Sequence, residues 1–366
     1  METVSQQLSH RQLLKIDRDY AQAASVANLI YVSDQQQGIC RIRKGNGFTY
    51  RFRNKPVHDQ STLNRIKKLA IPPAWSRVWI CPSEDGHIQA TGFDVKQRKQ
   101  YKYHPRWNAL RHETKFHRMI EFGKALPTLR EQVRKDLQLP GFPEAKVMAM
   151  VIGLMERTFI RIGNDGYEKL YGSYGLSTLK NNHVDIRGDT ITFSFKGKKG
   201  VYQRVLLKSR KFARIVKQCK AIPGKELFQY FDAAGEKRKV DSGQVNQYIK
   251  NCLKMDFTTK DFRTWAGTLG MLEALQCADP CSKKSDYQKN ISAAFEQVSG
   301  KLGNTVAVCK KYYVHPEIVR MYKDNELAGY FSEEGDQSAD LSREEALLMK
   351  ILSVIERTKV QVVGDT

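Results

Sequence analysis

The sequence predicts an α+β protein with a small β-rich N-terminal domain followed by a larger, mainly helical domain. Alternating apolar and polar residues near the N-terminus predict strands, because successive strand side chains point to opposite faces. From residue 108 onward, apolar residues recur mostly at helical spacing. We therefore expect a β-rich domain over 1–107, a mainly helical domain with a three-stranded antiparallel sheet over 108–330, and an acidic linker with a C-terminal helix over 331–366.

Strand patterns come first along the chain. The segment "GFTYRFR" places Phe48, Tyr50 and Phe52 on one face, as in a half-buried strand. The segment "VWICPSEDGHIQATGFD" predicts a hairpin that turns at Asp85-Gly86.

Basic and aromatic residues are interleaved in the next segment, "VKQRKQYKYHPRW". Tyr101, Tyr103 and Trp107 alternate there with Lys and Arg side chains. Aromatic rings between phosphate-binding cations suit a nucleic-acid surface, and a solvated charged strand is the alternative.

An apolar helix is predicted by "EAKVMAMVIGLMERTFIRIG", which we expect to be buried and to end in a C-cap at Gly163-Asn164. Arg157 and Arg161 then stand one turn apart on one face of its last turns. Cations at a helix C-terminus also complement the helix dipole, which is the interpretation we favour for Arg157.

A three-stranded antiparallel meander is predicted by "HVDI", "TITFSF" and "VYQRVLL", with Lys196, Lys198 and Lys199 at one tip. Lysines at hairpin tips are ordinarily solvated, so position alone does not assign them a function. The remainder to about residue 330 is predicted to be helical.

Two capping boxes mark helix starts in the C-terminal half of the chain. Thr258 with Asp261 predicts a helix that carries Arg263 in its first turn. Ser342 with Glu345 predicts a short amphipathic helix after the acidic linker, with a packing or regulatory role.

Net charge points to a polyanionic partner. Of 366 residues, 61 are Lys or Arg and 39 are Asp or Glu, giving +22, while a hydrophobic fraction of 41% is enough to fill folded cores. Nucleic acid is the polyanion that such a surface favours, and a basic protein without such a partner is the alternative. The polar N-terminus, the lack of a long apolar stretch and seven mostly solitary cysteines predict a cytoplasmic protein without membrane spans.

No cofactor is expected from the motifs. The sequence lacks a GxxxxGK[ST] loop, and "GNGFTY" lacks the third glycine of a dinucleotide-binding loop. The histidines of "HETKFH" are five residues apart, one too many for a zinc-binding helical pair. We therefore expect neither nucleotide nor metal.

Four residues in chain order could carry phosphoryl transfer without a metal: Arg161, Lys198, Arg263 and Tyr313. Arginines can donate bidentately to non-bridging phosphate oxygens and remain charged. A lysine can protonate a leaving oxygen, and a tyrosine beside cations can attack phosphorus.

In chain order, the motifs "IPPAWSRVWICP", "HIQATGFDVKQRKQYKYHP", "RIGNDGYEKLYGSYGLSTLKNNHV", "FKGKKG", "KDFRTW" and "LGNTVAVCKKYYVHP" resemble the bacterial branch of the poxvirus-like type IB DNA topoisomerases. The similarity covers roughly residues 28–323 in the same order. It implies a C-shaped clamp around double-stranded DNA, with a catalytic domain of the type shared with tyrosine recombinases. It also implies relaxation of supercoils through a 3′-phosphotyrosyl intermediate, without ATP or metal.

Site residues follow from the same resemblance. It makes Tyr313 the nucleophile, Arg161 and Arg263 the phosphate clamps, Lys198 the general acid, and Asn304 a donor to a non-bridging oxygen. It further implies DNA contacts, which are made by Lys260, Gln100, Tyr101 and Tyr103.

The chain departs from the family pattern at two positions. Asn304 replaces the histidine of poxviral members, and Phe93 stands where many bacterial members have arginine, which leaves one DNA contact open. Asn304 could instead cap a helix beside Thr305. Tyr312 is a rival nucleophile, although adjacent helical residues point about 100° apart and only one can reach the phosphate.

Two other functions remain alternatives: a tyrosine recombinase, and a non-catalytic DNA-architectural protein. Recombinases usually carry HxxR where this chain has "KDFR", and their N-terminal domain is helical. We expect a monomer that acts on the nucleoid.

Overall fold

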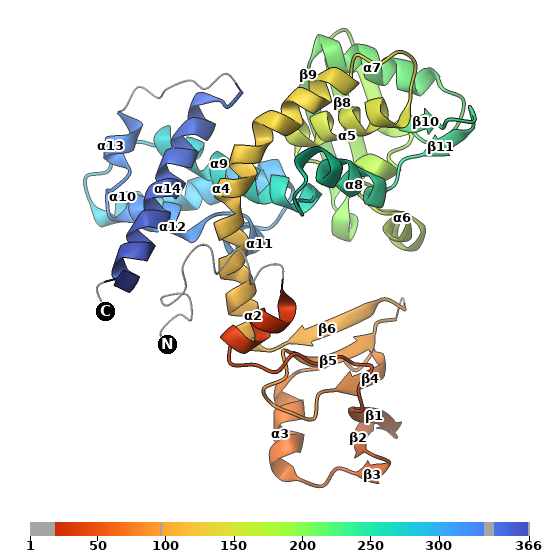
Figure 1. The fold of residues 1–366 in the computed structure, drawn as a ribbon, viewed down its shortest axis with the longest axis vertical. Coiled ribbons are helices and arrows are strands. Elements are labelled where there is room, and N and C mark those ends of the chain that lie inside the picture. The colour runs from red at the N-terminus through yellow and green to blue at the C-terminus, as the bar shows by residue number, and fades with distance from the viewer. Residues whose placement is uncertain (1–18, 96, 333–339, 365–366) are drawn as a thin grey trace. The chain divides into compact units, whose positions relative to one another are not determined.

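The computed structural model describes residues 19–95, 97–332 and 340–364. Contacts between residues divide the chain into two compact units. The first comprises residues 1–118 and 356–366, and the second comprises residues 119–355. Figure 1 shows a β-rich N-terminal part and a mainly helical remainder, so the predicted α+β class is confirmed.

The first unit contains a six-stranded antiparallel sheet in the order β3-β2-β1-β4-β5-β6. Its strands are β1 (Ile39–Lys44), β2 (Gly47–Phe52), β3 (Lys55–Pro56), β4 (Ser76–Ile80), β5 (Ile88–Phe93) and β6 (Lys99–Tyr103). The predicted hairpin is confirmed, because β4 pairs with β5 across the Asp85-Gly86 segment. Strand β6 lies at the edge of the sheet and pairs only with β5.

Two helices in this unit were not predicted: α2 (Tyr20–Val26) and α3 (Gln60–Lys68). Each begins after an aspartate whose side chain accepts a backbone N–H, Asp19 from Gln22 and Asp59 from Thr62. These N-caps were visible in the sequence. Ile66 of α3 packs with Ile39, Val78, Ile80 and Ala90 of the sheet to form a hydrophobic core.

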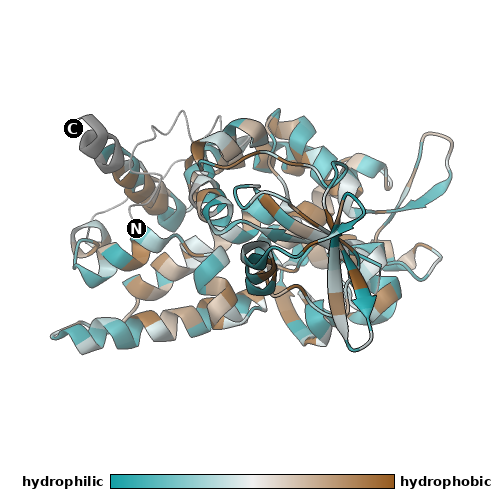
Figure 2. Ribbon diagram, turned by 90° about the horizontal axis from the view of Figure 1, so that it is seen from below, coloured by the Kyte–Doolittle hydropathy of each residue, from teal (hydrophilic) through white to brown (hydrophobic). Residues whose placement is uncertain are grey.

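Helices dominate the second unit. They are α4 (Pro105–Asp136), α5 (Glu144–Thr158), α6 (Asp165–Tyr171), α7 (Arg210–Ala221), α8 (Ser242–Leu253), α9 (Thr259–Gln276), α10 (Lys284–Leu302), α11 (Val306–Tyr312), α12 (Pro316–Lys323), α13 (Ala328–Phe331) and α14 (Arg343–Gly364). The first turns of α4 and the end of α14 belong to the first unit. Figure 2 shows hydrophilic and hydrophobic residues mixed along most helices, as expected for amphipathic helices that cover a core.

The predicted meander is confirmed as the antiparallel sheet of β7 (Val184–Arg187), β8 (Thr190–Lys196) and β9 (Tyr202–Lys208), with β8 central. The expectation that only helices follow it was wrong. A ribbon of β10 (Gln229–Phe231) and β11 (Lys237–Lys239) precedes α8. Its turn contains Gly235 with φ of 78°, a conformation that glycine adopts without strain.

The predicted end of the apolar helix was also wrong. Helix α5 is buried from Val147 to Met155, as expected, but it ends at Thr158, and Phe159 is the left-handed cap with φ of 55°. The next carbonyl groups leave the helical pattern, since Arg161 O accepts from Leu176 N at 2.9 Å. Arg161 therefore lies in a loop and shares no helix face with Arg157.

Within the described ranges, no helix combines the length and apolar character needed to span a membrane.

Candidate active site

Helix α9 presents Arg263 just past its first turn. The predicted capping box is confirmed, because the Thr258 N–H donates to the Asp261 carboxylate at 2.8 Å. Arg263 is only 6% exposed, and it donates from Nη1 to Phe159 O at 2.5 Å and from Nη2 to Leu302 O at 2.7 Å. Its Nε is buried without a hydrogen-bond partner within the described ranges. The guanidinium is thus anchored through Nη1 and Nη2, while its Nε donor remains unused among the residues described.

Arg161, in the loop after α5, also binds at the C-terminal end of α10, where Arg263 binds Leu302. Its Nη2 donates to Gly303 O at 3.1 Å and to the Asn304 side-chain oxygen. Leu302 is the last residue of α10, and Gly303 and Asn304 follow it in the turn before α11. Both arginines therefore bind one turn, although 102 positions separate them in the sequence.

The positive charges of the two guanidinium groups are not balanced by nearby carboxylates in the described ranges. Burial, and next the positive charge of Arg263, lower the pKa of Arg161 to about 10. Burial also lowers the pKa of Arg263, although Tyr313 opposes this shift. Neither arginine forms an ion pair with a carboxylate in the described parts of the chain. Such a site favours an incoming anion, because the anion would supply the missing counter-charge.

Tyr313 lies directly after α11, beside Arg263. The Arg263 guanidinium carbon is 5.1 Å from the centre of the Tyr313 ring, whereas the Tyr312 ring faces Lys311 and is 39% exposed. The structure therefore places the Tyr313 ring beside Arg263, and the Tyr312 ring beside Lys311.

The backbone of Tyr313 is held by α9. The Thr268 hydroxyl donates to Tyr313 O at 3.2 Å and accepts from His315 N at 3.0 Å. Gly267 allows this close approach, because a Cβ there would lie 2.9 Å from Tyr313 Cβ. Sequence reasoning missed both residues, since nothing in "WAGTLG" indicates a distant contact.

Asn304 belongs to the site and not to a helix cap. Its side-chain oxygen accepts from Arg161, and its Nδ2 is buried without a hydrogen-bond partner among the residues described. The N-cap of α11 is Thr305, whose hydroxyl accepts from Val308 N at 3.3 Å. The capping alternative is therefore wrong.

Lys198 lies on the tip between β8 and β9, in the 3-10 turn η4 (Lys198–Gly200). Its side chain is exposed, and it lines one small cavity together with Arg161 and Lys301. The tip therefore brings a lysine to the same cavity that Arg161 and Thr158, the last residue of α5, also line. Lys260 is exposed in the first turn of α9, one turn before Arg263.

In the first unit, the predicted DNA-contacting residues lie on β6. Tyr101 and Tyr103 are 43% and 39% exposed, and their rings stack with centroids 5.7 Å apart. Gln100 lies on the opposite face of the strand and donates to the Asp94 carboxylate at 3.1 Å. Tyr31 was missed, although its ring is half exposed and stacks on His87 at 4.5 Å.

Phe93 is covered by an arginine from the neighbouring strand. The guanidinium carbon of Arg77 lies 3.9 Å from the centre of the Phe93 ring. A cation therefore lies over residue 93 even though that residue is aromatic.

Comparisons with known proteins find similarity to DNA topoisomerases along most of the chain. The family described as "Eukaryotic DNA topoisomerase I, catalytic core" matches residues 102–334, and that described as "Bacterial DNA topoisomerase IB, N-terminal domain" matches residues 47–94. The chain is 33% identical over 298 residues to DNA topoisomerase 1B of Acanthamoeba polyphaga mimivirus, covering 79% of this chain and 88% of that relative.

More distant similarities were also found. DNA topoisomerase I of Monkeypox virus and DNA topoisomerase 1B of Vaccinia virus (strain Copenhagen) are each 23% identical over 236 residues, covering 64% of this chain and 72% of each relative. A solved structure of the XerH site-specific recombinase bound to its difH substrate, a pre-cleavage complex, gives a TM-score of 0.33 at 15% identity. That alignment covers 57% of this chain and 53% of the recombinase chain.

Proposed function

Because the chain belongs to the type IB DNA topoisomerases, we propose that Tyr313 is its nucleophile and that Arg161 and Arg263 clamp the phosphate it attacks. The protein relaxes supercoiled DNA through a transient break in one strand. One observation carries the assignment of residues: two guanidinium groups without carboxylate partners in the described ranges converge beside the Tyr313 ring. The recombinase and architectural alternatives are not favoured by the family matches.

The proposed reaction exchanges one phosphodiester for another. The Tyr313 hydroxyl gives up its proton to solvent water and attacks phosphorus, so that a phosphorus–Oη bond forms while the bond to the 5′ oxygen breaks. The strand then ends in a 3′-phosphotyrosyl link and a free 5′-hydroxyl. Attack by that hydroxyl reverses both bond changes, and the phosphodiester energy is retained throughout, so ATP is not needed.

The arginines and Asn304 stabilise the charge that develops on the non-bridging oxygens. Arg263 Nε and Asn304 Nδ2 are both buried donors without a partner in the described ranges. Buried donors are normally satisfied, so a phosphate bound here would complete both. Fixed donors that are already in place cost little reorganisation during the reaction.

Lys198 is the proposed general acid. Its hairpin tip shares a cavity with Arg161, and its side chain is free to turn toward a leaving 5′ oxygen. A protonated lysine at that oxygen supplies the proton that the departing strand needs. Lys260, on the same helix face as Arg263, is proposed to bind a DNA phosphate.

DNA contacts in the first unit are assigned to Gln100, Tyr101 and Tyr103. The stacked, exposed tyrosines offer hydroxyl donors and ring faces, and Gln100 requires release from Asp94 to reach DNA. The partner is double-stranded DNA, and the net charge of +22 favours it.

We further propose a monomer that acts at the nucleoid in the cytoplasm, with functional segments 1–107, 108–330 and 331–366. All five proposed catalytic side chains come from one chain and one unit, so a second copy is not needed. Light scattering of the free protein tests this, and a stable dimer would contradict it.

Plasmid relaxation tests the proposed function most directly. Supercoiled plasmid is incubated with the protein in EDTA without nucleotide, and the topoisomers are separated on a gel. We expect both positive and negative supercoils to relax completely. Activity that requires Mg²⁺ or ATP would contradict the proposal.

A further inference from the structure

Helix α14 begins beyond residue 334, where the match to the topoisomerase catalytic core ends. Its start is nevertheless buried in the second unit: Glu345 is 5% exposed, and Leu348 and Ile351 are fully buried. We propose that Glu345 is a positioning residue that holds α5 and α9, and through them Arg161 and Arg263, in the register that cleavage requires. This inference rests on the catalytic roles proposed above for the two arginines.

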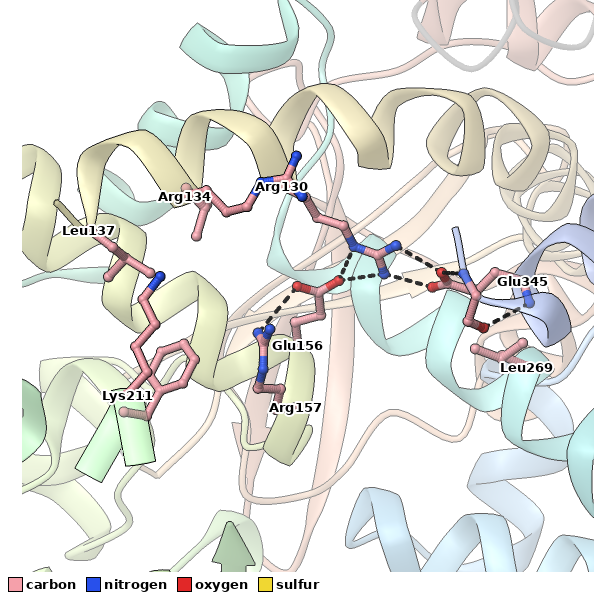
Figure 3. Close-up of a pocket in the computed structure, with 11 residues that line it drawn as sticks. Arg130, Arg134, Leu137, Glu156, Arg157, Lys211, Leu269 and Glu345 are labelled. Atoms are coloured by element: carbon pink, nitrogen blue, oxygen red, sulfur yellow. Dashed lines mark hydrogen bonds and ion pairs between the residues drawn. The ribbon is translucent and has the colours of Figure 1, made fainter. Parts of the chain in front are cut away.

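Glu345 is at the centre of a group of interactions that we call the Arg130 node: Arg130, Glu156, Glu345 and Trp265. Arg130 of α4 donates to both Glu345 carboxylate oxygens, at 2.8 and 2.7 Å, and from Nε to Glu156 at 2.6 Å. Figure 3 shows the Arg130 guanidinium pointing between the two carboxylates. The indole N–H of Trp265 donates to the same Glu345 at 3.1 Å. Four helices therefore meet at one charge cluster.

The node joins the two elements that carry the clamp arginines. Glu156 lies two residues before the last residue of α5, shortly ahead of the loop that holds Arg161. Trp265 follows Arg263 by two residues on α9. The end of α5 also accepts directly from Arg263, through Phe159 O. A displacement of α5 relative to α9 at the node would therefore separate the two arginines.

The geometry of the node resists such a displacement. A bidentate pair between arginine and carboxylate fixes orientation as well as distance. The backbone N–H of Ser342 also donates to Glu345 at 3.0 Å, so the carboxylate itself is held. Packing is close here, because a Cβ on Gly123 of α4 would lie 2.7 Å from the Trp265 ring.

A neighbouring ion pair provides a matched control. Arg134 of α4 pairs with Asp340 at 2.9 Å, just before α14, and its side chain is 54% exposed. Like Arg130, it links α4 to the start of the C-terminal segment, and both line the cavity drawn in Figure 3. Unlike Arg130, it forms no hydrogen bond or ion pair with α5 or α9 among the described residues. A variant of Arg134 therefore tests whether the C-terminal segment merely needs to be held against α4, whereas a variant of Glu345 also tests whether α9 needs to be positioned.

The test compares Glu345→Gln, Trp265→Phe, their double variant and Arg134→Ala in single-turnover cleavage, DNA affinity and thermal melting. Glu345→Gln keeps the shape of the side chain but removes the charge that makes the bidentate pair. Since a shift of about 1 Å can cost ~10²-fold in rate, we expect Glu345→Gln to slow cleavage by about 10- to 100-fold with unchanged DNA affinity. Arg134→Ala should cleave like the wild type.

The double variant tests whether both residues act by one route. If Glu345 acts through Trp265, the double variant should be no slower than the slower single variant. The proposal would be overturned if the slowing factors of the two single variants multiplied in the double variant. It would also be overturned if Glu345→Gln cleaved at the wild-type rate, or if Glu345→Gln and Arg134→Ala slowed cleavage equally. All rates are measured well below the melting temperature of every variant, so that unfolding does not contribute.

Arg263→Ala separates this inference from the function on which it rests. An inactive Arg263→Ala beside a fully active Glu345→Gln would remove the positioning role and leave the proposed active site intact. A fully active Arg263→Ala would instead contradict the active site.

Discussion

Several residues of the candidate site have charges or hydrogen-bond donors that are not compensated within the described ranges. Arg161 and Arg263 repel each other and are partly buried, and two donors, Arg263 Nε and Asn304 Nδ2, have no partner in the described ranges. Each such feature is unfavourable in the free protein. A phosphate diester between these groups would offset all of them at once. If these residues have the roles proposed above, their unmet charges and donors would favour tight binding of the reacting phosphate.

Tyr313→Phe should abolish formation of the covalent complex while DNA binding stays nearly unchanged, because only the attacking hydroxyl is removed. Tyr312→Phe is the matched control, and it should cleave normally, since the Tyr312 ring faces Lys311 rather than Arg263. Denaturing gels with end-labelled DNA detect the covalent complex. An inactive Tyr312→Phe with an active Tyr313→Phe would shift the nucleophile by one position.

Asn304→Ala should slow both cleavage and rejoining by ~10²–10³, the usual cost of losing one preorganised donor. Asn304→His should recover much of the activity, because a ring N–H can replace the amide N–H. Asn304→Asp is nearly isosteric but replaces the donor by a charge that pairs with Arg161, so we expect it to be the slowest. Single-turnover rates alongside thermal melting check this order, and an Asp variant that cleaves normally would contradict it.

Among the secondary-structure elements, α9 makes the most contributions to the candidate site. It carries Lys260 and Arg263 at its start, and its Gly267 and Thr268 hold the backbone around Tyr313. Distances along a helix are fixed at about 1.5 Å per residue, so α9 sets the separation between Arg263, the proposed clamp, and the backbone of Tyr313, the proposed nucleophile. The hairpin of β8 and β9 adds Lys198 independently, through its tip.

Gly267→Ala should slow cleavage by about 10- to 100-fold, because the new Cβ would press on Tyr313 and displace it. Gly270→Ala is the control on the same helix, since its Cβ would lie 3.5 Å from Val298, an ordinary contact. Alanine favours helix by about 1 kcal/mol over glycine, so Gly270→Ala should melt at the same or a higher temperature. Equal cleavage rates for the two variants would show that α9 does not position Tyr313 at Gly267.

Lys198→Ala should slow cleavage of a normal phosphodiester, because the leaving 5′ oxygen loses its proton donor. A substrate with sulfur in place of that oxygen has a far better leaving group. The variant should therefore cleave it almost as fast as the wild type does. Failure of this rescue in single-turnover assays would take the role of acid away from Lys198.

At the scale of the whole molecule, charge governs the encounter with DNA. The excess of 61 basic over 39 acidic residues extends beyond the site, with exposed cations on several elements, Arg210, Lys211, Arg214 and Lys217 of α7 among them. Binding to DNA phosphates releases counterions, so affinity depends on salt. Chemistry after binding depends on the partly buried site and should respond less to salt.

DNA affinity should therefore fall by about 10³–10⁵ between 50 and 200 mM salt, the range for a protein that contacts ~6–10 phosphates. Titrations of a labelled duplex at several salt concentrations measure the slope. The single-turnover cleavage rate at saturating protein should change far less over the same range. A flat plot of log affinity against log salt would argue against a clamp on the DNA backbone.

Elements whose signals are local could be predicted from the sequence. The hairpin at Asp85-Gly86, the meander over β7–β9, and the capping boxes at Thr258 and Ser342 depend on neighbouring residues, and all were predicted correctly. The order of its motifs was also enough to identify the family.

Contacts between distant parts of the chain became visible only in the folded protein. The fold ended α5 at Thr158 and moved Arg161 into a loop, because the Arg161 carbonyl binds residue 176 rather than the next helical turn. It joined Thr268 to Tyr313, and Arg130 to Glu345 across 215 positions. Such contacts depend on which buried donors and acceptors meet after folding, and neither helical nor strand periodicity carries that information.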